Sequence, residues 1–315
     1  MKPVIPLLSR AQPEERAAWM AHLSTELSNL VTVKAFEDLT GDERERAEVA
    51  IVANPDPADL RALPRLKWVH SLWAGVERLV AELPHDGPKI VRLADPQMAE
   101  TMSEAVLAWS LYLHRDMPRY ARQQNEKLWL EHPLKAPDER TIGILGLGKL
   151  GQAAALRLKG NGFQVAGWSR SEKVLDGIET YHGAKGLKTL LKHTDILILL
   201  MPLTEDTHGL IDKEALALLP KGASLINFAR GPLLDTDALR GALDNGHMSH
   251  AVLDVFDKEP LPEADPLWSH SKVTILPHIS APTTPATASK IVAENLGTFL
   301  RTGNIPESVD RGRGY

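Results

Sequence analysis

The stretch from residue 141 to residue 151 constrains the fold of this 315-residue chain more than any other feature. The apolar run Thr141–Leu145 has the length of a buried strand, and it leads directly into Gly-Leu-Gly-Lys-Leu-Gly, where a helical pattern begins. In such a turn the first glycine permits the sharp bend, the second lets a pyrophosphate approach the backbone, and the third lets the helix pack on the strand. The helix N-terminus then offers N–H groups to the phosphates. We therefore expect a dinucleotide here, held by Gly146, Gly148, Lys149, Leu150 and Gly151; a glycine-rich turn that binds nothing is the alternative.

Short apolar runs alternate with helical patterns on both sides of this turn. Before it, strands are predicted at 4–8, 30–36, 49–53, 68–72 and 89–93, with helices at 14–27 and 76–83. After the strand at 141–145, further strands are predicted at 164–168, 195–199, 223–227, 251–255 and 273–276, with helices at 150–159 and 287–300. This alternation predicts an α/β chain of two Rossmann- or flavodoxin-like, doubly wound domains with parallel sheets.

Between the two series lies a long helical pattern at 98–113, which Pro118 breaks or kinks. Helical spacing resumes at 119–130, and the proline-containing stretch 132–138 is typical of a linker.

Composition excludes several classes of protein. The chain has no cysteine, so disulfides, thiolate metal ligands and a cysteine nucleophile are excluded. A formal net charge of −5 gives no reason to expect a nucleic acid partner. The first apolar run, 4–8, contains Pro6 and is too short for a signal-peptide core or a membrane span. We expect a cytoplasmic protein without a metal site and without a membrane partner.

Three further motifs follow the glycine turn in order. Asn-Phe-Ala-Arg-Gly at 227–231 ends one strand, Leu-Asp-Val-Phe at 253–256 leads to Glu-Pro-Leu-Pro at 259–262, and Pro-His-Ile-Ser-Ala at 277–281 follows another strand. Together they strongly resemble the D-isomer-specific 2-hydroxyacid dehydrogenase family. Residues 72–77 look like the family's substrate loop, and the stretches 94–100 and 309–315 resemble the glyoxylate/hydroxypyruvate reductase A subgroup.

The resemblance implies a discontinuous substrate domain, 1–103 plus 287–315, with a dinucleotide-binding domain at 104–286 inserted into it. The active site would lie in the cleft between them. Relatives dimerise through the region corresponding to 98–130, which here contains Trp109, Tyr112 and Trp129, so a homodimer is expected. In related reductases a tryptophan at the place of Trp129 reaches the partner's active site; packing in a core or an interface is the alternative.

The implied activity is reduction of a small 2-keto acid, glyoxylate to glycolate or hydroxypyruvate to D-glycerate. Arg230 suits the carboxylate anchor, because guanidinium presents a fixed fork of donors. His278 suits the general acid, because its ordinary pKa lies near neutrality, and Glu259 suits the carboxylate that orients it. The alternatives are a surface arginine, a structural loop histidine and a solvated acid.

Other positions gain roles from the resemblance alone. Asp254, Ala229 and Ala281 would lie near the nicotinamide, and Pro202 and Thr207 would pass beneath the cofactor. Asp254 could instead cap the next turn, and Thr207 could cap its own loop.

The predicted substrate loop departs from its relatives at one position. Trp73 stands where related loops often carry a small residue. Gly75 and Val76 would offer backbone N–H groups to the substrate, unless they form an ordinary strand-to-helix turn. The substrate-contacting residues are expected to be Trp73, Ala74, Gly75 and Val76.

The strand at 164–168 predicts the choice of cofactor. NAD-dependent enzymes place an acid at the tip of this strand to bind the ribose hydroxyls. This chain has Ser169, Arg170 and Ser171 there, with Lys173 close behind. The missing acid and the added base predict that NADPH is preferred, with NADH as a second cofactor. A solvated arginine and a serine that only caps the turn are the alternative.

Two other functions stay open at this point. One is a broader D-2-hydroxyacid dehydrogenase, including a D-lactate type; a phosphoglycerate dehydrogenase is expected to be longer, and a formate dehydrogenase would lack the glutamate–histidine pair. The other is a cofactor-sensing binding protein, such as a transcriptional corepressor built on this fold.

Overall fold

The computed structural model describes residues 2–312, in two compact units. The split unit comprises Met1–Gln97 and Thr283–Tyr315, and the central unit is Met98–Pro282. The boundaries expected from the sequence, 103/104 and 286/287, fall inside two helices, α5 (Pro96–His114) and α11 (Pro285–Thr302). In the structure the chain passes between the units at 97/98, in the first turn of α5, and at 282/283, just before α11.

The split unit contains a five-stranded sheet in the order β2-β1-β3-β4-β5, with every neighbouring pair parallel. This is the flavodoxin-like strand order. Its strands are β1 (Val4–Ser9), β2 (Thr32–Ala35), β3 (Val49–Ala53), β4 (Trp68–Ser71) and β5 (Lys89–Val91). Its helices are α1 (Pro13–Glu26), α2 (Gly41–Arg46), α3 (Pro57–Arg61), α4 (Glu77–Glu82) and α11.

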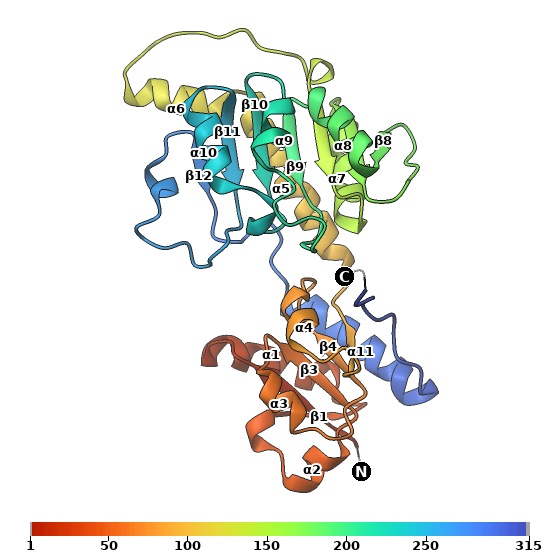
Figure 1. Ribbon diagram of the computed structural model, residues 1–315. Helices are drawn as coiled ribbons and strands as arrows, with labels where there is room; N and C mark the ends of the chain where they lie inside the picture. The colour runs from red at the N-terminus through yellow and green to blue at the C-terminus, as the bar shows by residue number, and fades with distance from the viewer. Residues whose placement is uncertain (1, 313–315) are drawn as a thin grey trace. The chain divides into compact units, whose positions relative to one another are not determined.

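Helix α11 comes from the far end of the chain, yet it packs beside α1 in this unit (Figure 1). Trp68 of β4 contacts Phe299 of α11 edge-on, with ring centroids 5.4 Å apart. The tail that follows α11 reaches the edge strand β5, where Val309 N–H donates to the carbonyl of Ile90 at 2.7 Å. Residues 313–315 of the C-terminal motif lie outside the described residues.

The central unit contains a seven-stranded parallel sheet in the order β12-β11-β10-β9-β6-β7-β8. Strand order reverses at β6, as in a Rossmann fold. The strands are β6 (Thr141–Leu145), β7 (Gln164–Ser169), β8 (Glu179–His182), β9 (Ile196–Leu199), β10 (Ala223–Asn227), β11 (Met248–Leu253) and β12 (Val273–Ile275). The helices are α5, α6 (Met117–Asn125), α7 (Lys149–Gly160), α8 (Gly183–Lys192), α9 (Lys213–Leu218) and α10 (Thr236–Asp244).

Helices cover both faces of this sheet (Figure 1), which explains why its inner strands β6, β9 and β10 are almost wholly buried. Successive side chains of a strand point to opposite faces. In β9, Ile196 and Ile198 pack in the cluster with α5 and α7, whereas Leu197 and Leu199 pack in the cluster with α8, α9 and α10. The α/β prediction of two doubly wound parallel sheets is confirmed.

The helix predicted at 119–130 is shorter than expected and starts earlier. Helix α6 begins at Met117, with Pro118 in its first turn, where a proline is tolerated. It ends at Asn125 because Lys127 adopts a left-handed backbone, with φ +56°, and Leu128 N–H then donates to the Gln123 carbonyl at 2.8 Å. The Gln123 side chain also donates to the carbonyl of Leu130 at 2.9 Å. Strand β8 and helices α8, α9 and α10 were not predicted; β8 is short and only half-buried.

A long segment, residues 126–136, joins α6 to the 3₁₀ turn before β6 (Figure 1). We call it the arm. Its apolar side chains face solvent, with Trp129 95% exposed, and Leu128, Leu130 and Leu134 about half exposed. By contrast, Trp109 and Tyr112 of α5 pack partly against the core of the central unit. Of the three aromatic residues expected at a dimer interface, Trp129 is the one with most of its surface uncovered.

In the part of the chain that the structure describes, no helix is both long and apolar enough to cross a bilayer.

Candidate active site

The three glycines of the turn after β6 meet different surroundings. Gly146 has φ +105°, and a Cβ there would lie 2.6 Å from the Met201 backbone nitrogen. A Cβ on Gly151 would lie 1.8 Å from the carbonyl oxygen of Gly146, so helix and strand approach too closely for any side chain. Around Gly148, in contrast, nothing lies within 4 Å of the Cβ position. Packing requires two of the glycines, and the third borders the open space that a pyrophosphate needs.

Helix α7 starts at this turn with the backbone of Lys149 and Leu150, and no side chain caps it. Its first turn carries no acid. The N–H groups at this helix end are therefore not satisfied by the capping bonds that protein side chains commonly supply, which suits an anionic ligand.

The carboxyl ends of three neighbouring strands bring the motif residues to one edge of the sheet. Arg230 follows β10, Asp254 follows β11 and His278 follows β12. Open α/β sheets bind ligands at this edge. The structure thus brings together, within one unit, residues that lie up to about fifty positions apart in the sequence.

Asn227, the last residue of β10, shapes the turn that carries Arg230. Its side-chain oxygen accepts from Ala229 N–H at 3.1 Å, and its amide nitrogen donates to the carbonyl of Arg230 at 2.9 Å. A Cβ on the next residue, Gly231, would lie 2.1 Å from the carbonyl carbon of Phe256. This close approach places the Arg230 turn against the segment that leads to Glu259. Asn227 belongs to the Asn-Phe-Ala-Arg-Gly motif but had no predicted role, although an asparagine at a strand end is typical of such a turn.

Glu259 and His278 form a hydrogen-bonded pair, with Glu259 Oε2 and His278 Nδ1 2.8 Å apart. The other oxygen, Oε1, accepts from Phe256 N–H at 2.9 Å and so orients the carboxylate. The Glu259 hydrogen bond raises the pKa of His278, against the lowering effect of burial and of nearby Arg230. Burial would raise the pKa of Glu259, but hydrogen bonds from His278 and Phe256 outweigh it and lower the pKa.

His278 itself has a left-handed backbone, with φ +54°. Such a conformation is uncommon outside glycine and needs support from its surroundings. The buried carboxylate of Asp254 supplies it, since one oxygen accepts from Ile279 N–H at 2.7 Å and the other from Ser280 N–H at 2.9 Å. Asp254 therefore caps the turn after His278, which is the alternative that the sequence left open for it.

The tip of β7 carries the residues at which the sequence predicts the cofactor preference. Ser169 is buried, and its hydroxyl donates to the carbonyl of Ser171 at 2.7 Å. Arg170 is exposed and lies 4.0 Å from Asp206. Lys173 donates to the carbonyl of Leu147, in the glycine turn, at 2.7 Å. Two cationic side chains thus belong to this tip, and Lys173 ties it to the glycine turn.

The loop after β9 is held by Thr207. Its hydroxyl donates to the carbonyl of Pro202 at 2.8 Å and accepts from Thr204 N–H at 2.8 Å. Ala229 is buried, and Ala281 packs partly against the core cluster that contains Phe228. Both alanines therefore lie against packed parts of the central unit, near the carboxyl ends of its strands.

In the split unit, the loop predicted to bind substrate follows β4. Trp73 packs edge-on against Trp19, with ring centroids 5.7 Å apart. Val76 is buried in the core, so only its backbone is free to meet a ligand, while Ala74 and Gly75 are half-buried. Ser71 was not predicted from the sequence, yet its hydroxyl binds both the N–H and the carbonyl of Trp73.

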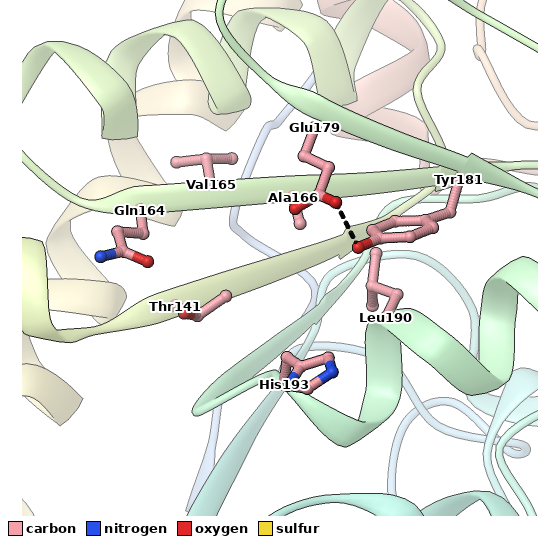
Figure 2. Close-up of a pocket in the computed structure, with 8 residues that line it drawn as sticks. All are labelled: Thr141, Gln164, Val165, Ala166, Glu179, Tyr181, Leu190 and His193. Carbon is pink, nitrogen blue, oxygen red and sulfur yellow. Dashed lines mark hydrogen bonds between the residues drawn. The ribbon is translucent and has the colours of Figure 1, made fainter.

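A hollow of about 300 Å³ lies elsewhere on the central unit (Figure 2). Thr141, Gln164 and Glu179, the first residues of β6, β7 and β8, line it. Tyr181 donates to Glu179 Oε1 at 2.5 Å across it, and this bond raises the pKa of Tyr181 to about 12. The hollow is at the amino ends of the strands, opposite the motif residues, and the sequence motifs give it no role.

Comparison with known proteins places these observations in context. The sequence profile of the D-isomer specific 2-hydroxyacid dehydrogenase NAD binding domain matches residues 107–280. A glyoxylate/hydroxypyruvate reductase A of Serratia proteamaculans is 39% identical, over 92% of this chain and 93% of its own. The same enzyme of Salmonella paratyphi B is 36% identical, over 96% of this chain and 98% of its own.

Solved structures agree. A D-isomer specific 2-hydroxyacid dehydrogenase of Xanthobacter autotrophicus, in complex with NADPH and MES, superimposes with a TM-score of 0.90 at 37% identity over 100% of both chains. An NADPH-dependent glyoxylate/hydroxypyruvate reductase of Sinorhizobium meliloti, in complex with NADP and sulfate, gives 0.86 at 29% identity over 100% of both chains.

Proposed function

Because the chain belongs to the D-isomer specific 2-hydroxyacid dehydrogenase family, we propose that it is an NADPH-dependent reductase of small 2-keto acids. Glyoxylate, reduced to glycolate, and hydroxypyruvate, reduced to D-glycerate, are its proposed substrates. The observation that carries the proposal is the Glu259–His278 pair at the same sheet edge as Arg230. A general acid and a carboxylate anchor are the two groups that such a reduction requires of the protein.

The residues present fit a dinucleotide. The open space beside Gly148 and the uncapped start of α7 suit a pyrophosphate, and the tip of β7 suits an adenosine ribose. When bound, NADPH supplies the hydride for the carbonyl carbon. The proposed contacts are Gly146, Gly148, Lys149, Leu150, Gly151, Ser169, Arg170, Ser171, Pro202, Thr207, Ala229, Asp254 and Ala281.

Arg230 is proposed to hold the substrate carboxylate and polarise the keto oxygen. Guanidinium stays charged at all physiological pH values and matches a carboxylate bidentately. The hydrogen bonds of Asn227 fix the backbone of the Arg230 turn. A fixed backbone limits the positions of the guanidinium and thereby favours one substrate orientation.

His278 is proposed to protonate the developing alkoxide from Nε2. Its Nδ1 faces Glu259, so that nitrogen carries the hydrogen shared with the carboxylate, and Nε2 is left for the substrate. After the transfer, His278 is neutral with its hydrogen on Nδ1, still bonded to Glu259. The raised pKa keeps more of the imidazolium available at neutral pH.

The preference for NADPH is proposed to come from Arg170, with Lys173 as a second cation. The three residues at the tip of β7, Ser169, Arg170 and Ser171, include no acid that would repel a 2′-phosphate. The Ser169 hydroxyl is turned toward the carbonyl of Ser171, so its contribution is to shape the turn that presents Arg170.

The backbone N–H groups of Gly75 and Val76 are proposed to bind the substrate carboxylate. The side chains of Trp73 and Ala74 would border the same ligand.

A homodimer is proposed to form through the arm. Exposed Leu128, Trp129, Leu130 and Leu134 make an apolar surface that a second copy would cover. Gln123 and His132 hold the arm in place, since Gln123 Oε1 and His132 Nε2 are 2.7 Å apart. Two-fold assembly is the commonest arrangement of soluble oligomers.

Consumption of NADPH in the presence of glyoxylate or hydroxypyruvate tests the proposed activity. A panel of 2-keto acids assayed with both cofactors would rank the substrates. Cofactor binding without turnover of any keto acid would refute the proposal in favour of a cofactor-sensing protein.

A further inference from the structure

The loop after β4 is fastened at its second residue by a single hydroxyl. Ser71, the last residue of β4, is 1% exposed. Its Oγ accepts from Trp73 N–H at 3.0 Å, and its O–H donates to the Trp73 carbonyl, also at 3.0 Å. Leu93 N–H donates to the same carbonyl at 3.2 Å. Both polar groups of the Trp73 backbone are therefore held.

The backbone N–H groups that follow have no such partners. Within residues 2–312, those of Ala74, Gly75 and Val76 make no hydrogen bond. The fixed backbone of Trp73 directly precedes them and therefore fixes the point at which this stretch begins. The indole of Trp73 adds a second restraint, because it packs against Trp19, a residue of α1 that is only 2% exposed.

Ser71 is in turn held by a neutral histidine. His70 is fully buried, and its Nδ1 lies 2.9 Å from the carbonyl oxygen of Ser71. A carbonyl only accepts, so Nδ1 carries the hydrogen and Nε2 accepts from the Asn295 side chain of α11, 2.9 Å away. Burial lowers the pKa of His70 to about 4, so the ring is uncharged at neutral pH, and its two hydrogen bonds select this tautomer.

We infer that Ser71 is a positioning residue for substrate binding, and that His70 and Asn295 hold it in register with α11. The inference rests on the proposed function, since it assigns the loop after Trp73 to the substrate carboxylate. A chain of hydrogen bonds runs from α11 through His70 and Ser71 to Trp73, and it sets where the free N–H groups point. A binding site gains from such fixed donors because little order remains to be imposed when substrate arrives.

The test compares Ser71→Ala with Ser289→Ala. Ser289 is a matched control, because it is also buried in the split unit and its hydroxyl has no hydrogen-bond partner among the described residues. For Ser71→Ala we expect KM for glyoxylate to rise about tenfold, with kcat changed less than about twofold and the Kd of NADPH unchanged. Hydrogen exchange of the Trp73 amide should become faster. Ser289→Ala should leave all four quantities as they are.

His70→Phe provides a second variant that keeps a flat ring in the core and removes both of its hydrogen bonds. His70→Phe alone should also raise KM for glyoxylate. In the double variant with Ser71→Ala, KM should rise by less than the product of the two single effects, because both residues act through one loop.

The outcomes separate the two ideas. If the wild type reduces no 2-keto acid, the proposed function fails, and Trp73 exchange still tests whether Ser71 orders the loop. Unchanged exchange in Ser71→Ala overturns the inference. Faster exchange with an unchanged KM in an active enzyme also overturns it, because the ordered loop would then not serve the substrate.

Discussion

At the scale of residues, the site depends on polar groups that shape backbone as much as on those that face a ligand. Both carboxylate oxygens of Asp254 accept from the N–H groups that follow His278. The side-chain amide of Asn227 stabilises the Arg230 turn in a similar way, by accepting from one backbone group and donating to another. Glu259 alone uses one oxygen for the backbone and the other for the histidine. The proposed acid and anchor are thus placed by their neighbours' hydrogen bonds.

Replacing Glu259 by Gln should move the pH limit for reduction downward. The general acid works while His278 is protonated, so the rate falls as pH rises through its pKa. The Glu259 carboxylate raises that pKa, and a neutral amide removes the charge that does so. The pH profile of kcat/KM with glyoxylate measures the effect; a profile that keeps its alkaline limit would show that another group sets it.

Replacing Arg230 by Lys should raise KM and lower kcat together. Lysine keeps the charge but loses the planar fork that holds a carboxylate and polarises the carbonyl. We expect kcat/KM for glyoxylate to fall at least about a hundredfold. Arg240→Lys, an exposed substitution on α10, is the control, and equal kinetics for the two variants would exclude Arg230 as the anchor.

At the scale of elements, the turn between β6 and α7 contains one glycine proposed to serve cofactor binding, Gly148, and another that close packing requires, Gly151. Gly148→Ala adds a methyl group where nothing lies within 4 Å, so the protein should fold with an unchanged Tm. The methyl group would occupy the space proposed for the pyrophosphate, and the Kd of NADPH should rise at least about tenfold. Gly151→Ala meets the Gly146 carbonyl and should lower Tm by several degrees. Wild-type NADPH affinity in Gly148→Ala would place the cofactor elsewhere.

The tip of β7 should decide between the two cofactors. Ser169→Asp combined with Arg170→Ala restores an acid and removes a cation, and the ratio of catalytic efficiencies should swing toward NADH by about ten- to a hundredfold. Lys188→Ala, on the exposed side of α8, controls for the loss of one positive charge. An unchanged ratio would mean that other residues hold the 2′-phosphate.

Elements also show where prediction from sequence succeeds. Buried parallel strands such as β3, β6 and β10 were predicted at their observed bounds, because a continuous apolar run between turn residues has few other meanings. The helix expected to reach residue 130 was wrong because the chain turns into a left-handed conformation at Lys127, and Leu128 N–H donates back to the Gln123 carbonyl. The spacing of apolar residues in the sequence does not indicate such a hydrogen bond.

Within the candidate site, local motifs led to Arg230, Glu259 and His278, because each occupies a recognisable place after a strand. Ser71 and His70 were missed for a physical reason. The ring of His70 is held by a hydrogen bond to Asn295, which lies 225 residues further along the chain. A local sequence pattern does not predict a contact between residues so far apart.

At the scale of the whole molecule, the arm exposes apolar side chains that no other part of the same chain within residues 2–312 covers. Trp129→Ala with Leu130→Ala should shift a dimer toward monomer in light scattering, because the pair removes exposed apolar surface proposed to lie in the interface. Val174→Ala removes an apolar side chain that is 89% exposed outside the arm and should not change the mass. A wild-type monomer at working concentration would contradict the dimer directly.

The most direct test of the account is NADPH oxidation with glyoxylate, measured for the wild type and for His278→Ala. We predict turnover by the wild type, and a kcat lower by about 10²–10⁴-fold in the variant, the usual contribution of a general acid. His22→Ala, on the exposed side of α1, should match the wild type. Nearly full activity in His278→Ala, or no NADPH oxidation by the wild type with any small 2-keto acid, would contradict the account.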